Sequence, residues 1–355
     1  MGAVSGPLLQ WFEKNRRLLP FRQEPSAYHI WISEIMLQQT RVSAALPYYE
    51  RFVAELPDPA ALAGCEPDRL RKLWQGLGYY SRAANLQKAA RIICEKYGGE
   101  LPADYDALRA LPGIGDYTAG AIASIAFGIP APAVDGNVLR VFARLTNDDS
   151  DITRPAARRA ITRLVMQEMP ADRPGPFNEA LMELGALVCL PGGAPRCAAC
   201  PLASICAGYA AGRAGTLPNR PPKPAKKTVQ VTAALIVGPQ GVLLERRGET
   251  GLLAGLWQPP AFEENRALTR EELSARLAAQ GIRVQWSGTL PPAKNVFTHR
   301  IWNLGGFWGQ GQAQELPENY VWADISALRR EYSVPSAFSA YLEPEKLCEI
   351  TGICP

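Results

Sequence analysis

The stretch LPGIGDYTAGAIASIAF, residues 111–127, decides the fold of the first part of the chain. Two glycines, Gly113 and Gly115, stand between a helix that we expect to end near Ala110 and a helix that we expect to begin near Asp116. Glycine adopts positive φ without strain, and unhindered N–H groups at a helix start bind anions. The pattern indicates a helix-hairpin-helix whose Gly113 and Gly115 bind phosphate, with an ordinary glycine-capped turn as the alternative.

The sequence on either side of this hairpin divides into two domains. Apolar residues recur at helical spacing up to about residue 209, so a helical domain is expected over residues 1–208. Residues 209–228 contain five basic residues, four prolines and no acid, which is typical of an extended linker. Alternating apolar residues and a GPQG turn then predict a β-hairpin, further strands and one helix, giving an α+β domain over residues 229–345 and a tail over residues 346–355.

Composition restricts the classes of function. The chain has 355 residues, a net charge of +4 and two histidines, His29 and His299, so a Ser-His-Asp triad or a multi-histidine zinc site is nearly excluded. We find no apolar run long enough to span a membrane and no signal peptide, so we expect a cytoplasmic protein without a membrane partner.

Four cysteines lie within eighteen residues in the pattern C-x7-C-x2-C-x5-C: Cys189, Cys197, Cys200 and Cys206. Four closely spaced thiolates can enclose a zinc ion or an iron–sulfur cluster. The number of ligands does not separate these two.

Two carboxylates are candidates for acid–base chemistry. Glu34 lies in YHIWISEIMLQQ, residues 28–39, which is apolar on nearly every side. Burial raises a carboxyl pKa and suits the group to donate a proton near neutral pH. Asp135 directly precedes a predicted helix in APAVDGNVLRVFARL. The alternatives are a surface glutamate and a simple N-cap aspartate.

The hairpin, the stretch WISEIMLQQTRV and the cysteine pattern together resemble adenine DNA glycosylases of the MutY type, in the endonuclease III superfamily. The resemblance implies a [4Fe–4S] cluster on the four cysteines, although the family has six residues, not seven, in the first gap. It also implies that Glu34 protonates a flipped adenine and that Asp135 stabilises the sugar cation, with Tyr117 and Asn137 nearby. Tyr117 replaces the lysine of bifunctional lyases, so a monofunctional enzyme is expected.

The same resemblance implies further site residues. Gln39 and Tyr79 would act as wedges in the DNA, and Arg22 and Glu179 would line the adenine pocket.

The carboxy-terminal half resembles the Nudix-like (MutT-like) domain that senses 8-oxoguanine, here through Phe297, Thr298 and His299, with threonine where the family has serine. The segment TREELSARLAAQGI lacks the final acidic pair of a Nudix hydrolase, so nucleotide hydrolysis is not expected.

These inferences together predict a function in base excision repair. The expected substrate is double-stranded DNA with adenine opposite 8-oxoguanine or guanine, bound by a monomer associated with the nucleoid. Two alternatives stay open: a glycosylase of the same fold with another target base, and an iron–sulfur DNA-binding module without catalysis.

Overall fold

The computed structural model describes residues 2–23, 25–222, 224–313, 315–328 and 330–352. It divides into two compact units, one made of Met1–Cys65 with Ala84–Pro222 and one made of Glu66–Ala83 with Lys223–Pro355. The boundary after Pro222 falls within the predicted linker. The grouping of Glu66–Ala83 with the carboxy-terminal residues had no signal in the sequence, because these residues have the same helical periodicity as their neighbours.

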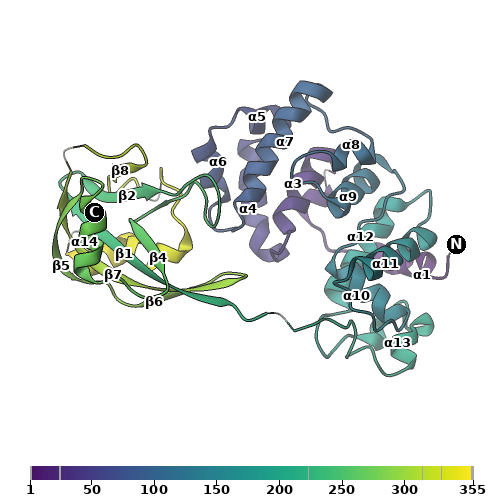
Figure 1. Ribbon diagram of the computed structural model, residues 1–355. Helices are drawn as coiled ribbons and strands as arrows, with labels where there is room; N and C mark the ends of the chain where they lie inside the picture. Colours follow the sequence, from purple (N-terminus) through teal and green to yellow (C-terminus); the bar gives the residue numbers. More distant parts are fainter. Residues whose placement is uncertain (1, 24, 223, 314, 329, 353–355) are drawn as a thin grey trace. The chain divides into compact units, whose positions relative to one another are not determined.

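The regular structure of the first unit is helical throughout its described residues, as predicted (Figure 1). Its elements are α1 (Ser5–Asn15), α2 (Pro20–Gln23), α3 (Ala27–Leu37), α4 (Val42–Glu55), α5 (Pro59–Gly64), most of α7 (Ser81–Tyr97), α8 (Tyr105–Arg109), α9 (Asp116–Phe127), α10 (Gly136–Leu145), α11 (Pro155–Glu168), α12 (Pro174–Leu187), two short 3-10 turns (Cys197–Ala199 and Ala203–Ile205) and α13 (Ala207–Ala210). The helices predicted to end near Ala110 and to begin near Asp116 are α8 and α9, so this prediction is confirmed.

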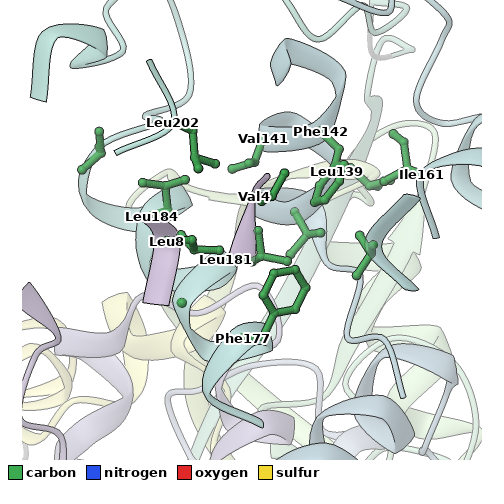
Figure 2. Close-up of a cluster of buried hydrophobic side chains, with 14 of the residues drawn as sticks. Val4, Leu8, Leu139, Val141, Phe142, Ile161, Phe177, Leu181, Leu184 and Leu202 are labelled. Carbon is green, nitrogen blue, oxygen red and sulfur yellow. The ribbon is translucent and has the colours of Figure 1, made fainter. Parts of the chain in front are cut away.

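A hydrophobic core holds α1, α10, α11 and α12 together (Figure 2). Leu8 of α1 and Phe177 and Leu181 of α12 are fully buried in it. Burying a side chain of this size stabilises the folded state by about 1.5–3 kcal/mol. The core therefore fixes α10 and α12, which carry several of the predicted site residues.

Helix α3 is buried on nearly every side, as its sequence predicts. Trp31, Ile32 and Met36 are fully buried, and α3 packs against α9. Ser26 begins the helix as its N-cap, accepting a hydrogen bond from the backbone N–H of His29 at 3.1 Å. The helix thereby holds Glu34 in an apolar environment.

The second unit contains α6 (Pro67–Trp74) and an eight-stranded sheet. The strands are β1 (Lys227–Gly238), β2 (Gly241–Arg246), β3 (Trp257–Gln258), β4 (Ala261–Glu264), β5 (Arg283–Thr289), β6 (Ala293–Val296), β7 (Arg300–Gln312) and β8 (Tyr320–Ala323). The central order is β3-β2-β1-β7-β5, with β4 on β1, β6 on β7 and β8 on β2. The predicted hairpin is confirmed by the antiparallel register of Val237 with Val242 in β1 and β2, whereas β1 and β7 run parallel.

Alternate residues of β1 enter two different cores. Leu235 lies in a core with Phe338 and Tyr341, whereas Ile236 lies in a core with Leu273 of α14 (Arg270–Ala278). Because successive side chains of a strand point to opposite faces, both faces of the sheet are covered. The α+β prediction for this part of the chain is confirmed.

The predicted tail, residues 346–355, begins inside a helix. Residues Ser339–Leu342 form α15 and Pro344–Thr351 form α16, whose Leu347 is fully buried in the same core as Tyr341. The boundary placed at residue 345 therefore cuts through a packed element, and residues 353–355 lie outside the described residues. Among the described residues, no helix is long and apolar enough to cross a membrane.

Candidate active site

A pocket of about 430 Å³ in the first unit brings together residues from α2, α3, α9, α12 and the start of α10. Seven residues predicted from the sequence line it: Arg22, Glu34, Gln39, Tyr117, Asp135, Asn137 and Glu179. They are separated by up to 157 positions in the chain, so only the fold could place them together. The pocket is the candidate active site.

Glu34 provides a carboxyl group whose pKa lies close to neutral pH. It is 7% exposed on the buried helix α3, and the hydroxyl of Tyr117 donates a hydrogen bond to its Oε2 atom. Burial raises the pKa of Glu34 to about 7, an effect strengthened by the charges of Asp135 and Glu179 and opposed by the Tyr117 hydrogen bond and Arg22. A carboxyl group with this pKa can donate a proton at neutral pH and take one back.

Asp135 is the N-cap of α10, as the sequence allowed. Its Oδ1 atom accepts hydrogen bonds from the backbone N–H groups of Asn137 and Val138, both at 2.8 Å, and its Oδ2 atom accepts one from Asn137 Nδ2 at 2.7 Å. Burial raises the pKa of Asp135, while these hydrogen bonds and Arg140 oppose the rise. The carboxylate is therefore fixed in one orientation at the pocket.

Asn137 is itself held in place by Arg140, which sequence reasoning missed. The Oδ1 atom of Asn137 accepts a hydrogen bond from Arg140 Nη2 at 2.8 Å, and the same nitrogen donates to the carbonyl oxygen of Gly185 at 2.9 Å. The amide nitrogen of Asn137 therefore points to Asp135. Arg140 lies three residues after Asn137 on α10, and this helical spacing is the signal by which it could have been found.

Arg22 and Glu179 form an ion pair at 2.9 Å, as expected of residues lining one pocket. A second acid, Glu183, was missed. It is 1% exposed and accepts hydrogen bonds from Arg17 Nε and Nη2, both at 2.8 Å, and from Arg22 Nη2 at 3.1 Å. Burial would raise the pKa of Glu183, but the two arginines hold it near 2. Glu183 lies one helical turn beyond Glu179 on α12, so the two side chains share one face of the helix. This spacing was the sequence signal by which Glu183 could have been assigned to the same pocket.

Gln39 is exposed and adopts φ of +59°, in the left-handed region. A non-glycine residue there is uncommon and persists only where the surrounding structure holds it. The neighbouring Gln38 donates a hydrogen bond to Thr118 Oγ1 of α9 at 3.3 Å. Gln39 thus stands at a turn that is anchored to α9.

The two hairpin glycines differ in the conformations they require. Gly113 has φ of +80°, and a Cβ atom there would lie 2.8 Å from Asn85 Cβ. Gly115 has φ of −96°, so it does not use the positive φ that a glycine permits. Its extended backbone is that of the N-cap of α9, which residues other than glycine also adopt.

Replacing Gly113 by alanine should therefore lower the free energy of unfolding by about 2 kcal/mol or more, from left-handed strain and the contact with Asn85. If the hairpin binds phosphate, as the sequence predicts, the substitution should also weaken duplex DNA binding, because the hairpin would move. Gly115→Ala is the matched control: its Cβ would have no neighbour within 4 Å, and a loss of less than about 1 kcal/mol is expected. Urea unfolding and duplex titration of both variants test this, and equal losses would contradict it.

The four cysteines line one small pocket of about 30 Å³ with apolar residues such as Val141 and Leu184. None of the four is in a disulfide. Arg144 Nη1 donates a hydrogen bond to Cys189 Sγ at 3.2 Å. In the part of the chain that the structure describes, no three His, Cys, Asp or Glu side chains are arranged to hold a metal ion. Four thiols that line one pocket are a donor set that fits a thiolate-bound group.

The seven-residue first gap between these cysteines loops toward solvent. Residues 191–194 are exposed, and the loop closes through a hydrogen bond from the backbone N–H of Arg196 to the carbonyl oxygen of Val188 at 2.9 Å. Arg144 donates to the carbonyl oxygens of Leu190 and Gly192 at 2.8 and 3.3 Å. The extra residue between the first two cysteines is therefore accommodated in the exposed loop, and all four thiols still line one pocket.

The second unit contains the remaining predicted residues. Phe297, Thr298 and His299 form the turn between β6 and β7, and the Phe297 ring packs edge-on against Trp302 with centroids 4.8 Å apart. Thr298 and His299 are exposed. The hydroxyl groups of Thr298 and Tyr79 are hydrogen-bonded, so this unit brings a predicted wedge and a predicted sensor residue together.

The chain matches two protein families along its length. The HhH-GPD superfamily of base excision DNA repair proteins matches residues 32–167, and the NUDIX domain matches residues 232–344. The chain is similar to the adenine DNA glycosylase of Mus musculus, with 35% identity over 84% of this chain and 68% of that protein. It is also 35% identical to the adenine DNA glycosylase of Homo sapiens, over 81% of this chain and 62% of that protein. The chain thus spans about two thirds of the length of these relatives.

A solved structure of a thermostable thymine-DNA glycosylase has a similar fold. Its TM-score is 0.54 at 27% sequence identity, and the match covers 58% of this chain and 95% of that chain. Because that protein acts on thymine by its name, the shared fold alone does not select the target base.

Proposed function

The chain belongs to the adenine DNA glycosylase family, and we propose that it is a monofunctional DNA glycosylase of base excision repair that removes adenine mispaired with 8-oxoguanine or guanine in double-stranded DNA. The observation that carries this proposal is the pairing of Glu34, whose pKa is about 7, with the fixed carboxylate of Asp135 in one pocket. A proton donor and a separate negative charge are what cleavage of a glycosidic bond needs.

The reaction begins when the adenine nucleotide leaves the base stack and enters the pocket. Extruding a base costs a few kcal/mol, and side chains that fill the gap offset part of that cost. Gln39 and Tyr79 are exposed residues suited to this role. Arg22 and Glu179 offer hydrogen-bond donors and acceptors to the polar edge of adenine.

Glu34 then donates its proton to a ring nitrogen of adenine, which makes the base a better leaving group. The bond between sugar C1′ and the base nitrogen breaks, and the base takes the electron pair. The ionised Glu34 accepts a proton from the attacking water, whose oxygen adds to C1′. The products are free adenine and an abasic site, and the carboxyl group is restored.

Asp135 stabilises the positive charge that develops on the sugar as that bond breaks. Asn137 and the N–H groups of α10 fix the orientation of its carboxylate, so little reorganisation is needed in the transition state. Tyr117 has no amine to attack C1′, so the chain should not cleave the DNA backbone itself.

We further propose that Cys189, Cys197, Cys200 and Cys206 hold a [4Fe–4S] cluster. The shared apolar pocket, the free thiols and the Arg144 donor support this proposal. The cluster would act as a structural support for the loop after α12 rather than as a reactant. Four iron and four acid-labile sulfide atoms per chain would support it, and one zinc would overturn it.

Thr298 and its neighbours are proposed to recognise 8-oxoguanine in the strand opposite the adenine. The exposed hydroxyl and imidazole groups of Thr298 and His299 can hydrogen-bond to the oxidised base.

The decisive experiment measures single-turnover base release from duplexes with A:8-oxoguanine, A:G, T:G and T:A pairs, read as strand breaks with and without alkali. Breaks that need alkali and are fastest for A:8-oxoguanine would support the proposal. Breaks without alkali would overturn the monofunctional assignment, and release of thymine from T:G would favour the activity named for the structural neighbour.

The rate of adenine release should fall as pH rises above about 7. The proton-donating form of Glu34 is the neutral one, and with a pKa of about 7 its population decreases about tenfold per pH unit above that value. Single-turnover rates between about pH 5.5 and about pH 9 test this. A rate that stays constant to the alkaline end would show that Glu34 is not the proton donor.

A further inference from the structure

Arg82 is a buried cation next to the turn that carries Tyr79. It is the second residue of α7 and only 8% exposed. Its Nη2 atom donates hydrogen bonds to the carbonyl oxygens of Leu77 and Gly78, both at 3.1 Å. Its guanidinium also lies 5.2 Å from the ring centroid of Trp74 and 5.7 Å from that of Tyr79. Burial lowers the pKa of Arg82 to about 10, so the side chain stays charged at neutral pH.

The turn held by Arg82 has an unusual backbone. Tyr79 adopts φ of +49°, in the left-handed region, and its side chain is 45% exposed. A bulky residue is rarely found there, and it stays there only when its neighbours fix it. Gly78, directly before it, has φ of +72°. The sequence alone would not predict two successive left-handed residues here.

Three donors fix the carbonyl groups around Tyr79. The Arg82 side chain binds the two carbonyl oxygens that precede it, and the Arg82 backbone N–H donates to the carbonyl oxygen of Tyr79 at 2.9 Å. Trp74 Nε1 donates to the carbonyl oxygen of Gly78 at 3.1 Å. The planar guanidinium can bind two carbonyl groups and lie against two rings at once, which a lysine cannot do.

We propose that Arg82 is a positioning residue that holds Tyr79 in its left-handed conformation, so that the exposed ring is preorganised to fill the gap left by a flipped nucleotide. The inference rests on the proposed function in one respect, the wedge role of Tyr79. Because the Arg82 side chain is buried, it does not contact DNA itself. It would affect DNA binding only by positioning Tyr79.

A double-mutant cycle separates this role from a general contribution to folding. We would measure the Kd for a duplex with a tetrahydrofuran abasic analogue opposite 8-oxoguanine, using the full chain and the variants Arg82→Lys, Tyr79→Ala and the double variant. Arg82→Lys keeps the charge, so long-range attraction to DNA is unchanged. We expect it to weaken binding about tenfold when Tyr79 is present and less than about twofold in the Tyr79→Ala background.

Arg91→Lys is the matched control, because Arg91 is an exposed arginine on the same helix. It should leave the Kd unchanged in both backgrounds. If Arg82→Lys does not fold, Trp74→Phe takes its place, because it removes the other side-chain donor to the Gly78 carbonyl oxygen and keeps an aromatic ring. It should raise the Kd by a smaller factor, and again only when Tyr79 is present. Equal losses in the two backgrounds, or an unchanged Kd for Arg82→Lys, would overturn the proposal.

Because binding to the abasic analogue needs no chemistry, the two proposals fail in different ways. Coupling between Arg82 and Tyr79 without adenine release by the wild type would overturn the proposed function and support the role of Arg82. Adenine release without coupling would support the function and overturn the role of Arg82.

Discussion

Replacing Glu34 by glutamine should lower the single-turnover rate of adenine release by about 10³-fold, within the range that general acid catalysis contributes. Glutamine fills nearly the same space and can still accept the hydrogen bond of Tyr117, but it cannot donate a proton to adenine. Duplex binding should be unchanged, because Glu34 is buried in the pocket and does not need its charge to hold phosphate.

The stability of the same variant distinguishes lost chemistry from lost structure. Since the pKa of Glu34 is raised from 4.5 to about 7 in the folded state, the folded chain retains a proton that the unfolded chain has lost between these pH values. Wild-type stability therefore falls as pH rises through this window, by on the order of 3 kcal/mol in total. Glu34→Gln removes this penalty, so it should be more stable than the wild type at pH 8.

Glu50→Gln, at an exposed position of α4, is the matched control and should change neither rate nor stability. The measurements are single-turnover kinetics, duplex titration and urea unfolding at about pH 6 and about pH 8. If Glu34→Gln released adenine within about tenfold of the wild-type rate, the proton would have to come from another group.

Local signals explain what the sequence predicted correctly. The start of α9 after the glycines, the burial of Glu34 on α3 and the N-cap at Asp135 each depend on residues within one or two helical turns. Periodicity and capping preferences report such features directly. The strands β1 and β2 were found for the same reason, because alternation and a tight turn are local.

Features that depend on distant partners were missed. Glu183 is bound by Arg17, 166 positions away, and the sequence contains no signal for that pairing. The left-handed backbones of Gln39 and Tyr79 were also missed, because neither residue is a glycine and only the surrounding contacts hold them. Gly115, by contrast, has the extended backbone of an N-cap at the start of α9, although a glycine in a hairpin also permits positive φ.

Replacing Asp135 by asparagine should lower the rate of adenine release by about 10²–10³-fold, the usual effect of removing one preorganised electrostatic group. Asparagine is as good an N-cap as aspartate, so the hydrogen bonds from the N–H groups of Asn137 and Val138 can remain. Its amide nitrogen would then face Asn137 Nδ2, which Arg140 prevents from turning. This contact between two donors should cost about 1 kcal/mol of stability, too little to unfold the chain.

Asp58→Asn tests whether capping alone explains the loss. Asp58 is also an N-cap, of α5, and accepts a hydrogen bond from the backbone N–H of Ala61 at 2.8 Å. The same substitution there should leave adenine release unchanged, because Asp58 does not line the pocket. If Asp135→Asn kept a rate within about threefold of the wild type while melting normally, Asp135 would be a structural cap and the sugar cation would need another source of negative charge. If it lost the rate and kept its affinity for the duplex, the charge itself would be what the reaction uses, because capping and binding would both have survived the substitution.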